Sequence, residues 1–123
     1  MRALVADDEP QICELLSEFL SRRGYEVTTA LDGEEALSAL RREKPDLFLL
    51  DLYMPELDGL GLLRKICDES LDAGTIWTMT GMGDDDAARA SLRLGATDFF
   101  TKPVDLRHLD WRLRLERAHE NFV

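Results

Sequence analysis

The sequence contains no long hydrophobic run. A membrane-spanning helix needs about 18 consecutive apolar residues, and no apolar stretch among the 123 residues approaches that length. The N-terminal residues also lack the extended apolar segment that a signal peptide carries. We therefore expect a soluble protein that resides in the cytoplasm and has no contact with a membrane.

Cysteine is also scarce. Cys13 and Cys67 are the two cysteines of the chain, and both fall within segments of helical periodicity. Neither belongs to a C-x-x-C motif or to another metal-ligand spacing. Reduced thiols with a structural role are therefore expected.

Positive charge is in short supply. The chain has 15 lysine and arginine residues against 25 aspartate and glutamate residues, which gives a formal net charge of −10. Nucleic-acid affinity depends largely on neutralising phosphates with basic side chains, so this composition argues against direct binding to DNA or RNA. It suits a protein that holds a cation or meets a basic partner.

Linkers, repeats and low-complexity segments are absent, and residues 1–123 are interpreted as one domain. Short apolar runs alternate with segments of helical periodicity, which predicts an α/β fold with a parallel sheet and right-handed crossovers. The expected strands are 3–6, 26–30, 46–50, 75–79 and 98–101. The expected helices are 10–22, 32 to before Pro45, one starting near 58, 84–86 to 95, and 106–119.

Two of the helices carry clear sequence signals. The second begins at Asp32, and Glu35 follows three residues later as in a capping box. The first begins with Pro10, which is tolerated in a first turn. Its apolar face at helical spacing consists of Ile12, Leu15, Leu16, Phe19 and Leu20.

Polar residues of a particular kind follow four of the apolar runs. Asp7 and Asp8 follow the first run, Asp51 the third, Thr80 the fourth and Lys102 the fifth. Because the carboxyl ends of parallel strands lie along one edge of the sheet, these side chains are expected in one crevice.

This set of residues favours phosphoryl chemistry. Crowded carboxylates repel each other unless a cation neutralises them, and Mg²⁺ is commonly held by one or two carboxylates. We therefore predict a Mg²⁺ site, with Mn²⁺ as an alternative ion. A lysine and a hydroxyl can hold phosphate oxygens, which leaves one carboxylate free to attack in line and form an aspartyl-phosphate.

In order and spacing these motifs resemble the receiver domain of two-component response regulators, the family of the chemotaxis response regulator. The resemblance rests on LVADDE (4–9), LLDLYMPELDG (49–59), TG (80–81) and TKP (101–103), together with DGEEAL (32–37) and GATD (95–98). It implies a three-layer, flavodoxin-like (βα)5 fold whose five-stranded parallel sheet has the order 2-1-3-4-5.

The resemblance also implies a role for each residue of the crevice. Asp51 would accept the phosphoryl group and contribute to the metal site. Asp8 would bind Mg²⁺ directly, Asp7 mostly through water, and the backbone carbonyl of Tyr53 would be a further ligand. Lys102 would hold a phosphoryl oxygen.

A second group of residues would form the switch. Thr80 would follow the phosphoryl group on activation, and Phe99 would then pack inward; the alternative is a Phe99 that belongs to the core in both states. Pro103 would follow a cis peptide bond. Tyr53 and Met82 occupy positions that tune phosphate lifetime in this family, and their bulk predicts slow hydrolysis.

The last helix carries two apolar stripes, one of which is expected to face the sheet. The inner stripe consists of Leu106, Leu109 and Leu113, and the outer stripe of Trp111, Leu115, Ala118 and Phe122. The outer stripe predicts an interface with a second copy or with an effector domain, against the alternative of ordinary scattered exposure. Trp77, in the fourth strand, is expected in the core.

The leading interpretation is a phosphoacceptor switch rather than an enzyme, although it would assist its own phosphorylation and dephosphorylation. It would receive phosphate from a sensor histidine kinase or a phosphotransfer protein. It would then change the surface of the fourth helix, last strand and last helix to control a partner or effector. The chain is either a stand-alone regulator or the front of a longer protein, and the uncovered outer stripe favours the latter.

Two alternatives remain open from the sequence. One is a phosphatase-type enzyme that works through an aspartyl-phosphate. Tyr53 stands where haloacid-dehalogenase-type enzymes normally carry a second acid, which argues against it. The other is a degenerate receiver that only binds partners, and the intact set of Asp51, Lys102 and Thr80 argues against that.

Overall fold

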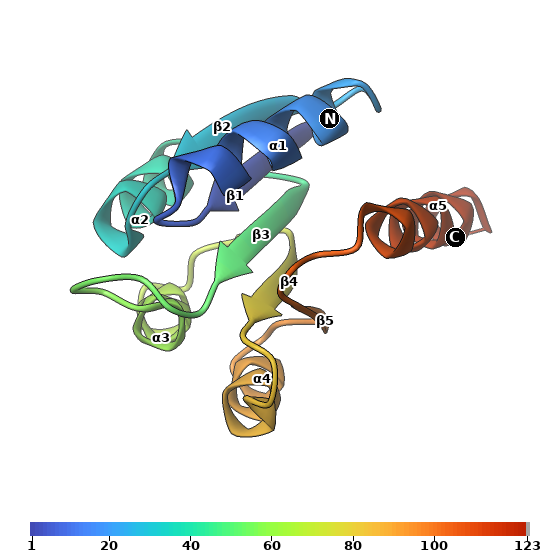
Figure 1. The fold of residues 1–123 in the computed structure, drawn as a ribbon. Helices are drawn as coiled ribbons and strands as arrows, with labels where there is room; N and C mark the ends of the chain where they lie inside the picture. The colour runs from blue at the N-terminus through green and yellow to red at the C-terminus, as the bar shows by residue number, and fades with distance from the viewer. Residues whose placement is uncertain (123) are drawn as a thin grey trace.

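The computed structural model describes the backbone of residues 1–122 and the side chains of residues 1–118. Within these residues five strands alternate with five helices (Figure 1). The strands are β1 (Arg2–Ala6), β2 (Glu26–Ala30), β3 (Leu47–Asp51), β4 (Thr75–Thr80) and β5 (Asp98–Thr101). The helices are α1 (Pro10–Ser21), α2 (Gly33–Arg42), α3 (Gly59–Asp68), α4 (Asp85–Arg93) and α5 (Leu106–Phe122).

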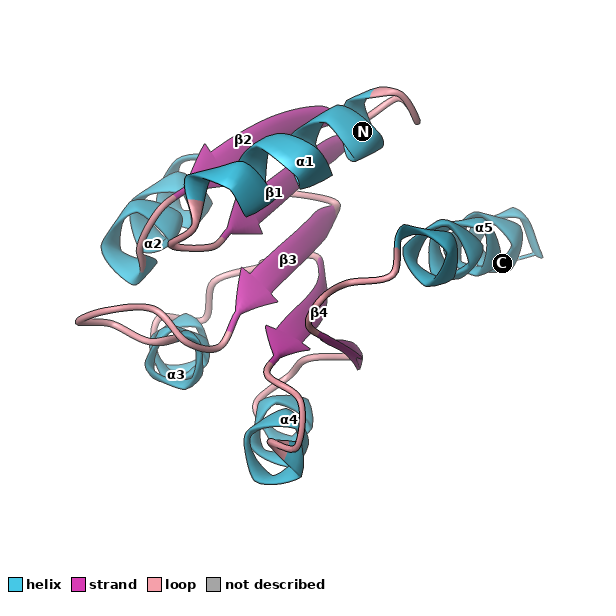
Figure 2. Cartoon of the chain, viewed as in Figure 1, coloured by secondary structure: helices cyan, strands magenta, loops and turns pink. Residues whose placement is uncertain are grey.

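The strands form one parallel sheet in the order β2-β1-β3-β4-β5. α1 and α5 cover one face, while α2, α3 and α4 cover the other, so the domain has three layers (Figures 1 and 2). The predicted fold class and strand order are thereby confirmed. Ala6 pairs with Leu50 in the register of β1 and β3, so the two strands end at the same edge of the sheet.

Alternation along the strands divides the core into two halves. In β1, Leu4 and Ala6 join the cluster under α2 and α3, whereas Ala3 and Val5 join the cluster under α1 and α5. All five residues of β3 are buried, as expected for a central strand covered on both faces. Trp77 is 0% exposed, which confirms its predicted place in the core.

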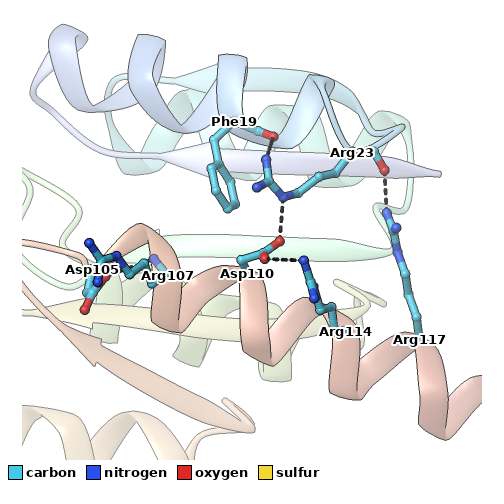
Figure 3. A network of polar contacts seen from close by, with 7 residues as sticks. All are labelled: Phe19, Arg23, Asp105, Arg107, Asp110, Arg114 and Arg117. Atoms are coloured by element: carbon cyan, nitrogen blue, oxygen red, sulfur yellow. Dashed lines mark hydrogen bonds and ion pairs between the residues drawn. The ribbon is translucent and has the colours of Figure 1, made fainter.

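Polar contacts fasten α5 to the end of α1 (Figure 3). The guanidinium of Arg23 lies 3.6 Å from the centroid of the Phe19 ring, and its Nε donates to Asp110 at 2.7 Å. Arg114 pairs with the same carboxylate at 3.1 Å, and Arg117 donates to the backbone carbonyl of Arg23. Together with Leu109 and Leu113, the two buried residues of the inner stripe of α5, these contacts hold the two helices side by side.

One position of α1 departs from the predicted stripe. Leu15 is 47% exposed, and Cys13 takes its place among the buried residues, with Leu16, Phe19 and Leu20. The predicted stripe was too wide because the sheet covers only the side of the helix centred on Leu16 and Leu20. Both cysteines are free, as expected, but Cys67 is exposed.

The ends of the other elements agree with the predictions to within a few residues. β2 and β5 have the expected bounds, and β3 ends one residue later than expected, at Asp51. Asp32 caps α2 by accepting from the backbone N–H of Glu35 at 2.8 Å, which confirms the predicted cap. Among the described residues, no helix is both long and apolar enough to cross a membrane.

Gly59 allows α3 to pack against the end of β3. A Cβ atom at this position would lie 2.6 Å from Cα of Leu52 and 2.7 Å from the carbonyl oxygen of Asp51. Because these are backbone atoms, Gly59→Ala is expected to lower the free energy of unfolding by about 2 kcal/mol or more. Urea denaturation measures the loss.

Gly81→Ala is the matched control, since no atom lies within 4 Å of the corresponding Cβ position. We expect it to change the free energy of unfolding by less than about 1 kcal/mol. Equal losses in the two variants would contradict the steric account.

Candidate functional site

The predicted crevice lies at the carboxyl edge of the sheet. β1 leads into Asp7 and Asp8, β3 ends at Asp51, and β5 leads into Lys102. Carboxylate oxygens of the three aspartates lie within 4.8 Å of one another. Nζ of Lys102 lies 2.7 Å from Asp7 and 3.2 Å from Asp51, so the structure brings all four side chains together.

Asp51 is almost fully buried, with 2% of its surface exposed. One carboxylate oxygen accepts from the backbone N–H of Tyr53 at 3.1 Å, and the other faces Lys102. Burial raises the pKa of Asp51 to about 7, with the charge of Asp7 adding to the effect and Lys102 opposing it. The cost of charging this side chain follows first from its burial and then from the neighbouring carboxylate of Asp7.

Asp7 is the other buried acid, at 0% exposure. Its Oδ1 accepts from the backbone N–H of Glu9 at 2.9 Å. Its Oδ2 lies 2.7 Å from Nζ of Lys102 and has no other polar partner within the described part of the chain. A carboxylate oxygen has two lone pairs, so an oxygen with one lysine partner can still coordinate a cation.

Lys102 links the two buried acids. Burial alone would lower the pKa of this ammonium, but the hydrogen bond to Asp7 and the charges of Asp51 and Asp7 outweigh it and raise the pKa. Lys102 therefore stays charged and carries one positive charge against three carboxylates. Oxygen-only donors of this kind suit Mg²⁺ or Mn²⁺, with the exposed Asp8 completing the cluster.

The switch residues stand near this edge in different environments. Thr80 is buried at the end of β4, and its carbonyl accepts from the backbone N–H of Lys102 at 2.7 Å. Phe99 is 36% exposed, so it is not a core residue in this structure. The peptide bond between Lys102 and Pro103 is cis, as predicted.

Tyr53 and Met82 are both exposed, Met82 to 82% of its surface. Their influence on phosphate lifetime, and the part of the Tyr53 carbonyl in metal binding, stay predictions. On α5, Trp111, Leu115 and Ala118 are exposed as the outer stripe requires. The side chain of Phe122 lies outside the described residues.

Cys13 was not recognised as part of this region from the sequence. Its thiol donates to the backbone carbonyl of Asp7 at 3.3 Å, and burial, followed by the charge of Asp7, raises the thiol pKa. The spacing contained a signal for this position. Cys13 lies three residues before Leu16, which places both on the buried side of α1, and it is only six residues after Asp7.

A comparison with known protein families agrees with this geometry. The profile described as "Response regulator receiver domain" matches residues 3–114. The chain belongs to this family. It is a receiver domain of two-component response regulators, which favours the switch over the two alternatives left open above.

Curated relatives are transcriptional regulators. The receiver is 44% identical over 121 residues to "Probable transcriptional regulator ycf27" of Cyanophora paradoxa, covering 98% of this chain and 50% of the relative. It is 40% identical over 113 residues to "Alkaline phosphatase synthesis transcriptional regulatory protein PhoP" of Bacillus subtilis (strain 168), covering 92% of this chain and 47% of the relative. The chain thus spans about half the length of the curated relatives it matches.

Solved structures agree in fold. The Francisella response regulator 1452 receiver domain matches with a TM-score of 0.84 and 27% identity, over 95% of this chain and 98% of that one. The receiver domain of NtrX from Brucella abortus matches with a TM-score of 0.81 and 37% identity, over 96% and 98%. The whole receiver fold is therefore shared with both.

The raised pKa of Asp51 predicts a pH-dependent stability in metal-free solution. Between the ordinary pKa of 3.8 and the folded-state pKa of about 7, the folded chain retains a proton that the unfolded chain has lost. Its contribution to stability therefore falls as the pH rises through this interval. Asp51→Asn cannot ionise, so its advantage over the wild type should grow from near zero at pH 4 to the order of 2–4 kcal/mol at pH 8.

Urea denaturation in EDTA at several pH values measures this difference, with Asp68→Asn as an exposed control that should show none. Addition of Mg²⁺ should reduce the advantage, because the ion stabilises only the form with the full set of carboxylates. An advantage that does not vary with pH would contradict the assignment.

Proposed function

We propose that this receiver accepts a phosphoryl group on Asp51 and acts as a switch in a two-component phosphorelay. The observation that carries the proposal is the pairing of a buried carboxylate with Lys102 at 3.2 Å, inside a cluster of three acids. A structural ion pair would need one acid for one lysine. The two additional carboxylates provide the surplus of oxygen donors that a metal-dependent phosphoryl transfer requires.

In the proposed reaction an Asp51 oxygen attacks the phosphorus of a phosphohistidine. The new bond joins carboxylate oxygen to phosphorus, and the bond from phosphorus to the imidazole nitrogen breaks, so the histidine leaves with the bonding electron pair. Tyr53 holds the second oxygen of the nucleophile through its backbone N–H. Lys102 and Thr80 stabilise the charge on the transferred oxygens.

Mg²⁺ would be held by Asp7, Asp8, Asp51 and the Tyr53 carbonyl. When bound, it would supply the positive charge that offsets carboxylate repulsion and the charge of the phosphoryl oxygens. This role is supported by the three carboxylates, whose ligand atoms lie within 4.8 Å of one another.

The partners follow from the reaction and from the relatives. A sensor histidine kinase or a phosphotransfer protein would be the donor in the cytoplasm. Since the relatives are transcriptional regulators about twice as long as this chain, we infer that the receiver controls an attached effector domain. DNA contacts would belong to that domain, because the receiver carries a net charge of −10.

The output surface would be formed by α4, β5 and α5. Exposed apolar side chains gather on these elements: Phe99 is 36%, Trp111 58% and Leu115 41% exposed. The start of α4 is acidic at 84–86, whereas α5 carries exposed arginines at 107 and 114. An apolar surface with charges of both signs suits a second copy or the effector domain.

Acetyl phosphate with Mg²⁺ tests the phosphorylation. Intact mass spectrometry should find one added phosphoryl group on the wild type and on Asp68→Asn, and none on Asp51→Asn. Continuous release of phosphate without a stable adduct would indicate the phosphatase-type enzyme. Absence of any adduct on the wild type would indicate a receiver that only binds partners.

Sedimentation velocity tests the output surface. With Mg²⁺ and beryllium fluoride as the phosphoryl analogue, the wild type should dimerise, and Trp111→Ala should weaken the association by about tenfold or more, as for loss of an aromatic anchor. Leu15→Ala is the matched control, since Leu15 is similarly exposed but lies on α1. If the wild type remained monomeric with and without beryllium fluoride, the homodimer would be excluded, and the effector domain would be left as the partner of this surface.

A further inference from the structure

Among the described residues, α4 buries smaller side chains than the other helices do. Its buried residues are Ala88 and Ser91, both small. By comparison, each of α1, α2 and α3 buries four residues. Burial of apolar surface provides most of the free energy that holds a helix on a sheet. The attachment of α4 therefore depends more on polar contacts than that of its neighbours does.

That polar contact is a hydrogen bond between two buried hydroxyl groups. Oγ1 of Thr78 in β4 lies 2.9 Å from Oγ of Ser91 in α4, and both residues are 0% exposed. Ser91 donates its own proton to the carbonyl of Ala88 at 2.7 Å. Because a hydroxyl has a single proton, Thr78 is the donor of the bond that joins strand and helix.

Thr78 is placed where a movement at the site would reach it. It lies two residues before Thr80, so both side chains point to the face of the sheet that α4 covers. It also stands in register with Leu50, the neighbour of Asp51, and with Phe99 in β5. Among the described residues this is the one buried side-chain hydrogen bond between α4 and the sheet.

We propose that the Thr78–Ser91 hydrogen bond is a latch that holds α4 on β4 in the unphosphorylated domain, and that these two positioning residues thereby set how tightly the Asp51 site binds a phosphoryl group. When Thr80 is drawn toward the phosphoryl oxygens, the chain between Thr80 and α4 moves with it. Ser91 is then displaced from Thr78, and the buried bond breaks. The latch therefore opposes the conformation that the phosphoryl group favours.

The direction of the hydrogen bond makes the two single variants unequal. Ser91→Ala leaves the Thr78 hydroxyl in a buried place without an acceptor, which destabilises only the docked conformation. In Thr78→Val every remaining donor keeps its acceptor, because the Ser91 hydroxyl still donates to the carbonyl of Ala88. The double variant replaces both hydroxyl side chains by apolar ones. It leaves no buried hydroxyl without a partner, so the docking of α4 on β4 is again favourable.

The proposal rests on the proposed function, and its test uses the affinity for beryllium fluoride in the presence of Mg²⁺, measured by calorimetry. Ser91→Ala should bind about 3–10-fold more tightly than the wild type. Thr78→Val and the Thr78→Val/Ser91→Ala double variant should bind no more tightly than the wild type. Equal tightening in both single variants, or none in Ser91→Ala, would overturn the latch.

Hydrogen exchange of the α4 amides, without metal or beryllium fluoride, gives a second reading. The amides should exchange faster in Ser91→Ala than in the wild type, and at the wild-type rate in the double variant. The higher helix propensity of alanine would by itself slow the exchange of the α4 amides. Faster exchange in Ser91→Ala can therefore be assigned to loss of the hydrogen bond with Thr78, and slower exchange would overturn the proposal. If the wild type failed to bind beryllium fluoride, the proposed function would fail, while exchange would still decide whether the latch exists.

Discussion

The structure depends on two buried carboxylates that share one lysine. The strand order places β1 beside β3, so Asp7 and Asp51 must emerge next to each other, at 0% and 2% exposure. Lys102 arrives from β5 and lies within 3.2 Å of both acids. The carboxylate oxygens of Asp7, Asp8 and Asp51 lie within 4.8 Å of one another. Like charges this close in a buried site are costly, and a single ammonium cannot balance all three. The edge of the sheet is therefore built to gain a cation.

The two faces of the sheet are attached to their helices in different ways. Under α1 and α5 lie large side chains, including Trp77, and Arg23 joins the two helices through Asp110. α4, on the other face, is held by small residues and by the hydroxyl pair of Thr78 and Ser91. Helices with few buried contacts belong to the less stable parts of a protein. The site thus stands beside a helix whose buried side chains are small.

Much of this arrangement could be predicted from the sequence, and the remainder could not for physical reasons. Apolar runs that end in Asp7, Asp51 and Lys102 identify the strands and the site together, because parallel strands share one functional edge. Periodicity could not predict that Leu15 is exposed, since the width of a buried stripe depends on the partner surface. Nor could it predict the bond of Ser91, because a serine in a helix indicates no partner until the tertiary structure supplies one.

Charge at the edge and packing at α4 are connected through β4. Three carboxylates and one ammonium leave the site short of positive charge, and a divalent cation would correct this. A phosphoryl group then adds negative oxygens, whose balance requires further donors. Lys102 is shared with Asp7, so in the proposed switch a further donor would come from the end of β4, where Thr80 stands. Any shift there acts on the strand that holds Ser91 through Thr78. In the proposed switch, an imbalance of charge at one edge would in this way become a change of packing on one face, which is a form of signal that a partner surface can read.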